Sequence, residues 1–196
     1  MSTPLQVVAV IDGPAVGVDT HPFMLDGPLA WVAWQRSGLP MDTSDPVDFD
    51  LPLGRWEIGG TWGWQCSAGV LDVAAHTAGQ MRRKPATAEM SRYTRDRKHH
   101  CGLGPHKARD TTLAVVWLHT ITWQLTSIDQ PTLEGMLTDI THLGKHYSRG
   151  YGRVREWQIT DGVPDGWRAR PLPSPTGSLQ GVRPPYHHLS RKVVCT

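Results

Sequence analysis

The chain has 196 residues, of which 39% are hydrophobic, and its formal net charge is +2 at pH 7 with neutral histidines. This length can bury a core without disulfide staples, as one domain or as one domain with a large insertion. The three cysteines, Cys66, Cys101 and Cys195, form no CxxC pair, which excludes a disulfide framework and favours a reducing cytoplasm. The sequence shows no signal-peptide pattern and no apolar run of membrane-spanning length. We therefore expect a cytoplasmic protein without a membrane partner.

The charge is distributed unevenly along the chain. Up to Ala75 there are two basic residues, Arg36 and Arg55, against nine acidic ones, whereas from His76 onward there are eighteen basic residues against nine acidic ones. Such an asymmetry favours a polyanionic partner for the basic half, although a lopsided solvated surface would have the same composition.

The first half of the chain predicts one strand, one helix and a short pair of strands. Leu5 to Ile11 alternates as a strand does, and a turn follows at Gly13-Pro14. Leu25 to Arg36 is predicted as a helix capped by Asp26, with Leu29, Val32 and Ala33 toward the core. A loop rich in Pro and Asp then leads to one or two strands between Arg55 and Ala68, around a turn at Gly59-Gly60.

The second half begins with a segment that lacks large aliphatic residues, from His76 to Asp110. The clearest strand follows over Thr112 to Leu125, with one face formed by Val115, Trp117, His119, Ile121, Trp123 and Leu125. Helical spacing then joins Leu133, Met136, Leu137 and Ile140, with Asp129 or Gln130 as the cap and Gly144 as the stop. A last strand is expected from about Arg153 to Thr160, before an irregular end that begins near Trp167.

This order of elements predicts an α+β fold of the ferredoxin-like type, a split βαβ arrangement also found in RNA-recognition domains. An antiparallel sheet would carry two helices on one face. Residues 1–75 would form the first half of the domain and residues 112–173 the second half. Residues 76–111 would be a basic, thumb-like insertion, and residues 174–196 an irregular tail.

The most informative motif lies between the second predicted helix and the last predicted strand. Three glycines permit backbone angles and close approach that side chains would forbid, three cations can contact phosphates, and two tyrosines offer faces on which bases can stack. A helix C-cap needs one such glycine, so the combination favours nucleic-acid binding. The predicted RNA-binding residues of this glycine-rich loop are Gly144, Lys145, His146, Tyr147, Ser148, Arg149, Gly150, Tyr151, Gly152 and Arg153.

The basic segment before the long strand is the second candidate. Clusters of cations with few acids between them neutralise phosphates with little reading of sequence, although a charged run is most often a solvated loop. The predicted RNA-binding residues of this basic arm are Arg82, Arg83, Lys84, Arg92, Tyr93, Arg95, Arg97, Lys98, His99 and His100. Neither segment has the GxxxxGK[ST] pattern of an ATP-binding loop, and no cofactor is expected.

A glycine-rich loop that ends in Ser-Arg-Gly-Tyr-Gly-Arg-Val, from Ser148 to Val154, resembles the RAMP superfamily of CRISPR-associated proteins. Further segments are similar to the small RAMP subunit of type IV CRISPR effector complexes, which is equivalent to the subunit that caps the 5′ handle of the guide RNA in type I systems. These segments are Gly13-Pro14, His21 to Ala30, Trp64 to Ala68 and Arg170 to Pro173. The resemblance covers roughly residues 5 to 173, and it departs from the common pattern at His146 and Tyr147, where basic residues are usual.

The resemblance implies a function without catalysis. Such a subunit would grip the 5′ handle of a crRNA, or of another guide-like RNA, and close one end of a filament of larger RAMP backbone subunits. Its other partners would be the large and small effector subunits of the same ribonucleoprotein. The basic arm would correspond to the thumb-like insertion that touches RNA and the neighbouring backbone subunit.

Three alternatives stay open from the residues alone. A RAMP endoribonuclease that processes repeat RNA would need an acid and a base, for which His99, His100, His106, His146 and Tyr147 are available. A zinc site could use His99, His100, Cys101 and His106, or His187, His188 and Cys195, but the spacing matches no standard finger. A scaffold that touches only protein is favoured by nine tryptophans, of which we expect most, including Trp117 and Trp123, in the core. The acidic first half, with Asp45, Asp48 and Asp50, could face such a protein neighbour.

Overall fold

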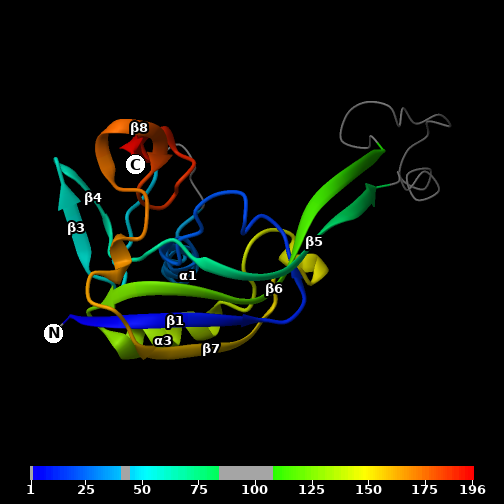
Figure 1. Cartoon of the computed structure of the whole chain (residues 1–196), viewed down its shortest axis with the longest axis horizontal. Helices are drawn as coiled ribbons and strands as arrows, with labels where there is room; N and C mark the ends of the chain where they lie inside the picture. Colours follow the sequence, from blue (N-terminus) through cyan, green and yellow to red (C-terminus); the bar gives the residue numbers. More distant parts are fainter. Residues whose placement is uncertain (1, 41–44, 84–107) are drawn as a thin grey trace.

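The computed structural model describes residues 2–40, 45–83 and 108–196 (Figure 1). These residues form an α+β fold that is rich in antiparallel strands, as the sequence predicts at the level of class. Most of the residues predicted for the basic arm lie outside the described residues, as do Cys101 and His106. The arm residues concerned are Lys84, Arg92, Tyr93, Arg95, Arg97, Lys98, His99 and His100. None of the helices in the described part is long and apolar enough to cross a membrane.

The main sheet is built around two long central strands, β1 (Thr3–Ile11) and β6 (Arg109–Ser127), which pair antiparallel. On the other side of β1 lies β7 (Val154–Asp161), and on the other side of β6 lies β5 (Val70–Arg83). The short β2 (Pro14–Ala15) follows β1 in the chain and also pairs antiparallel with β6. The order across the sheet is therefore β7, β1, β6 and β5, with each neighbouring pair antiparallel.

The two described α-helices, α1 (Asp26–Ser37) and α3 (Gln130–Asp139), lie side by side and share the core with the sheet. Alternate residues of β1 are buried because a strand turns every second side chain to the same face, and they pack with apolar residues from both helices. Arg36 of α1 donates to the Asp139 carboxylate of α3 at 2.7 Å and to the carbonyl oxygen of Gly135 at 2.8 Å. The buried set includes Leu5, Val7, Ala9, Leu29, Val32, Leu133 and Leu137.

The predicted helix caps are right for one helix and wrong for the other. The Asp129 side chain accepts a hydrogen bond from the backbone amide of Thr132 at 3.2 Å, so it caps α3 as expected. Asp26 does not cap α1: it is the first helical residue, and its buried carboxylate turns to the C-terminal part of the chain. Gly144 does not stop α3, which ends at Asp139, five residues earlier.

The prediction that Trp117 and His119 belong to the buried face of the long strand is wrong. Trp123 is fully buried, but 45% of Trp117 is exposed and its neighbours Val116 and Leu118 are buried instead. The cause is an irregularity in the β5–β6 register next to Leu118, where Thr120 faces Asp72 and Leu118 faces Val73. His119 therefore has no paired residue in β5, and the alternation of buried and exposed residues changes phase at this point of β6.

A second, smaller cluster joins the tryptophan-rich segment to the end of the chain. The strands β3 (Arg55–Ile58) and β4 (Thr61–Trp64) form the expected hairpin around Gly59 and Gly60, which both have positive φ. The tail, expected to be irregular, contains β8 (Pro173–Gly181) and β9 (Lys192–Cys195), which pair antiparallel. The buried residues of this cluster are Trp56, Trp167, Val182 and Cys195.

The outer parts of β5 and β6 form a two-stranded ribbon that projects from the body of the molecule, away from both termini (Figure 1). Paired residues run from Val70 and Thr122 in the sheet to Arg83 and Arg109 at the far end of the described ribbon. The segment predicted as an insertion from residue 76 thus begins within β5, and its described parts extend the main sheet.

Candidate nucleic-acid interface

The glycine-rich loop, residues 144–153, is fixed at its base by backbone hydrogen bonds to the segment after β1. The amide of Lys145 donates to the carbonyl oxygen of Val16, and the amide of Gly152 donates to that of Pro14, both at 2.8 Å. The amide of Leu143 donates in turn to the carbonyl oxygen of Gly152 at 2.8 Å. The loop therefore starts and ends on a fixed backbone frame, and the 3-10 turn η1 (Tyr147–Arg149) lies at its middle.

The three glycines of the loop have different structural reasons to be present. All have positive φ, of 88° at Gly144, 84° at Gly150 and 69° at Gly152. A Cβ at Gly144 would lie 2.5 Å from the carbonyl oxygen of Val16, and one at Gly152 would overlap the carbonyl oxygen of Leu143. A Cβ at Gly150 would meet nothing within 4 Å. Two glycines therefore allow the base to close, and only Gly150 leaves backbone open to a ligand.

Most of the polar side chains of the loop lie at the surface. Lys145, Ser148, Arg149 and Arg153 are exposed, and so is 64% of Tyr147, while His146 and Tyr151 are partly buried. Within the described part of the chain, the side chains of Lys145, Arg149 and Arg153 form no hydrogen bond or ion pair. Among the described residues, nothing competes with an anion from solvent for these cations.

Two residues of the predicted arm, Arg82 and Arg83, lie in the described ribbon, and both are exposed. The Arg82 guanidinium is 3.0 Å from a carboxylate oxygen of Asp110 on the opposite strand. Arg83 faces Arg109 across the ribbon, so two cations are neighbours at its described end. An exposed ion pair contributes little to stability, and it leaves Arg82 able to exchange its partner.

The loop and the ribbon meet at the same end of the molecule, where the yellow loop lies at the root of the β5–β6 ribbon in Figure 1. The Tyr151 hydroxyl lies only 3.3 Å from the position of a Cβ at Gly79 in β5. The glycine-rich loop thus contacts the described part of the ribbon.

A groove of about 420 Å³ opens beside the loop and was missed by sequence reasoning. Its walls come from the first turns of α1, with Trp31, and from the segment after α3, with His142, Lys145 and Tyr147. The rings of His142 and Tyr147 lie 6.4 Å apart between centroids. Only Trp31 could have indicated this groove from the sequence. In the predicted helix it lies two residues after Leu29, on a different face from the residues expected in the core.

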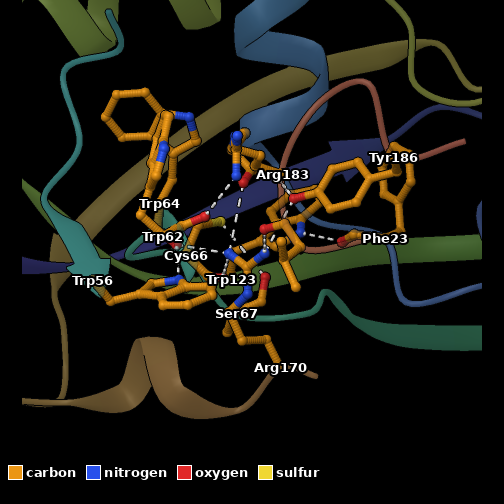
Figure 2. Close-up of polar contacts among 12 residues, drawn as sticks. Phe23, Trp56, Trp62, Trp64, Cys66, Ser67, Trp123, Arg170, Arg183 and Tyr186 are labelled. Atoms are coloured by element: carbon orange, nitrogen blue, oxygen red, sulfur yellow. Dashed lines mark hydrogen bonds and ion pairs between the residues drawn. The ribbon is translucent and has the colours of Figure 1, made fainter. Parts of the chain in front are cut away.

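Three of the segments that carried the similarity to type IV subunits, residues 21–30, 64–68 and 170–173, meet in a buried cluster around Arg170, which Figure 2 shows. The Arg170 guanidinium donates to the carbonyl oxygens of Trp64 at 2.6 Å, Cys66 at 3.0 Å and Val182 at 2.6 Å. It also lies 3.6 Å from the carboxylate of Asp26, which accepts a hydrogen bond from the Tyr186 hydroxyl. The Arg170 and Asp26 side chains are both 0% exposed.

Burial controls the ionisation of this cluster. Burial raises the pKa of Asp26, and the nearby Arg170 guanidinium opposes that shift. Burial also raises the pKa of Cys66 to about 12 and that of Tyr186 well above its ordinary value. The Cys66 thiol and the Tyr186 hydroxyl therefore keep their protons at neutral pH. Because the Arg170, Asp26 and Cys66 side chains are buried, we interpret the cluster as a clamp between α1, β4 and the C-terminal sheet.

Two acidic residues of the first half of the chain form ion pairs with arginines of the same chain. Asp48 pairs with Arg183 at 3.3 Å and with Arg191 at 3.0 Å, and Asp50 pairs with Arg55 at 2.6 Å. This reduces the negative charge available to a protein neighbour. Among the residues that the structure describes, no three His, Cys, Asp or Glu side chains gather as metal ligands, and this includes His187, His188 and Cys195.

Comparison with known families decides the assignment. The model of the family described as CRISPR type IV associated protein Csf3 matches residues 95–195, just over half of the chain. The chain belongs to this family. The similarity to a type IV CRISPR subunit, inferred from motifs, is thereby confirmed. No curated protein matches the chain at a significant level.

The Csf3 match covers the glycine-rich loop, Arg170 and Tyr186, whereas Asp26 and Trp31 precede it. The chain is accordingly a component of a type IV CRISPR system.

Proposed function

We propose that this chain is a non-catalytic, RNA-binding subunit of a type IV CRISPR ribonucleoprotein. It grips the 5′ handle of the crRNA and closes one end of a filament of larger RAMP subunits. The observation that carries the proposal is the exposure of Lys145, Arg149 and Arg153 on a loop that contacts the β5–β6 ribbon, where they have no partners among the described side chains. Such cations bind a phosphate backbone with little regard to sequence.

The sheet supports a RAMP-type, ferredoxin-like domain. If β1, β5, β6 and β7 are counted as its first to fourth strands, their order across the sheet is fourth, first, third, second. One helix follows the first strand and one follows the third, which is the succession of a split βαβ fold. The β3–β4 hairpin and the β8–β9 sheet are additions to that core.

The test is to purify the assembled type IV complex from cells through a tag on this chain and to sequence the bound RNA. We expect one discrete RNA population with a constant 5′ end. Replacing Arg149 and Arg153 with alanine should reduce the RNA recovered per complex. Random RNA, or complexes that form equally well after nuclease treatment and carry no RNA, would contradict the handle-gripping role.

Removal of one hydroxyl group, that of Tyr147, can distinguish the endoribonuclease alternative from RNA binding without catalysis. Tyr147 of the loop and His142, which precedes the loop, are acid–base candidates whose ring centroids lie 6.4 Å apart. Incubation with repeat RNA should leave the RNA intact. Specific products that disappear in a Tyr147→Phe variant, which keeps the ring, would replace our proposal with a catalytic one.

A further inference from the structure

The groove beside the glycine-rich loop has a mostly apolar lining and is firmly built. Phe23 lines the groove, and its carbonyl oxygen accepts hydrogen bonds from the Trp123 indole at 2.7 Å and from the Gly69 amide at 2.9 Å. The Phe23 ring packs 6.1 Å from the Trp123 ring between centroids. Gly27 and Pro28 of α1 form the adjoining wall. The volume of about 420 Å³ falls within the range of about 300–1,000 Å³ typical of small-ligand sites.

Two exposed aromatic rings stand at the groove, although burial would be the favourable state for such side chains. Trp31 is 45% exposed and Tyr147 is 64% exposed, whereas Trp56, Trp64, Trp123 and Trp167 are all buried. Trp31 comes from α1 and Tyr147 from the loop, so the rings approach the groove from separate elements. Flat, apolar and accessible faces of this kind suit a planar aromatic ligand.

The polar groups at the groove give its rim a positive character. The aliphatic part of Lys145 lies against Gly17, where a Cβ would come within 3.0 Å of its Cδ atom. Its ammonium group therefore reaches the rim with its stem supported. The acidic group at the groove, Asp139, is paired with Arg36 at 2.7 Å, so its charge is compensated within the chain.

We propose that this groove takes one unpaired base of a single-stranded RNA, stacked on Trp31 and Tyr147, with the flanking phosphates on Lys145 and Arg149. The inference rests on the proposed RNA-binding function and adds a base-binding subsite to it. The apolar lining and exposed rings match a base, and the cationic rim matches the phosphate on either side. A duplex is a poor ligand because its bases are already stacked and paired inside the helix.

The test uses the full chain and two single-stranded RNA probes of equal length, one with all bases and one with a run of abasic sites, measured by fluorescence anisotropy. Trp31→Ala and Tyr147→Ala should each weaken binding of the base-containing probe about tenfold. Neither substitution should change binding of the abasic probe by more than about twofold. Trp31→Phe and Tyr147→Phe should restore most of the affinity. Leu179→Ala, which changes an equally exposed apolar residue on β8, is the matched control.

The possible results separate the subsite from the function on which it rests. If Arg149→Ala weakens both probes but Trp31→Ala weakens neither, the RNA-binding role stands and the base subsite is wrong. If no loop variant affects either probe, the proposed function itself fails. If Trp31→Ala leaves RNA binding intact but reduces recovery of the neighbouring subunits, the groove binds protein and our inference is overturned.

Discussion

The Arg170 cluster and the glycine-rich loop both contain residues on which the resemblance to CRISPR-associated proteins rests, yet the structure uses them in opposite ways. Arg170 is enclosed, and its guanidinium donates to three carbonyl oxygens of the chain itself. Arg149 and Arg153 are exposed and have no side-chain partner among the described residues. Arginines in a motif can thus hold the fold together or face a ligand, and burial distinguishes the two roles.

The comparison extends to the glycines of the loop. Gly144 and Gly152 resemble the Arg170 cluster, because contacts within the chain account for them. Gly150 lies with the exposed arginines, since a Cβ there would meet no atom. The loop therefore has a structural base and an outward-facing middle, and substitutions can probe the two parts separately.

The largest loss of stability is expected from Arg170→Met. The substitution leaves the buried Asp26 carboxylate without its cation. It also removes one donor from each of three carbonyl oxygens, although that of Trp64 keeps the Trp56 indole as a donor. Loss of one partner of a buried pair costs about 3–5 kcal/mol of unfolding free energy, which urea denaturation would measure. Arg168→Met is the matched control, because Arg168 is exposed and should change stability by less than about 1 kcal/mol. Equal effects of the two substitutions would refute the clamp.

A smaller but clear difference is expected between Gly152→Ala and Gly150→Ala. Both alanines would adopt positive φ at a cost of about 1–2 kcal/mol, but only the one at residue 152 would also overlap Leu143. Gly152→Ala should therefore lower the unfolding free energy by about 1 kcal/mol or more beyond Gly150→Ala, and should also weaken RNA binding because the loop base opens. Thermal unfolding of the two variants measures the difference, and identical midpoints would show that the base is not closed as described.

The smallest effect on stability is expected at Asp129, which lies in neither the Arg170 cluster nor the glycine-rich loop. It shows how much an exposed hydrogen bond contributes to stability. Its hydrogen bonds to the side chain and amide of Thr132 lower the pKa of the carboxyl. Because the folded-state pKa is depressed, the stabilisation is present above the ordinary pKa of about 3.9 and is lost as the pH falls through the folded-state value. Asp129→Ala should lower the melting temperature slightly at pH 7. The difference from the unchanged chain should disappear in strong acid, and a difference that grows there would contradict this cap.

The sequence predicts elements that depend on local pattern. The strands β1 and β7, the β3–β4 hairpin, both helices and the Asp129 cap follow from periodicity, turn glycines and capping chemistry. The change of phase at Leu118 could not be foreseen, because an irregular register depends on the partner strand and not on β6 alone. The strands of the tail were missed because Pro and Gly interrupt the alternation of β8.

The candidate site was predictable only in part, for a related reason. Residue type alone identified the exposed cations of the loop. Asp26 was taken for a cap because its position in the sequence suits one, and its true partners, Arg170 and Tyr186, lie far along the chain. The groove was missed because Trp31 and Tyr147 come together only through the packing of α1 against the segment after α3.

The most direct test of the central claim is a salt series of equilibrium binding between the full chain and a single-stranded RNA. We compare the unchanged chain with the double variant Arg149→Ala and Arg153→Ala, and with Arg168→Ala and Lys192→Ala, an equal loss of charge in the C-terminal part. The loop variant should bind more weakly, and its plot of log K against log salt should be shallower by about 1.4, since each lost phosphate contact removes about 0.7. The control should keep the affinity and slope of the unchanged chain. Three indistinguishable plots would show that the glycine-rich loop does not hold RNA.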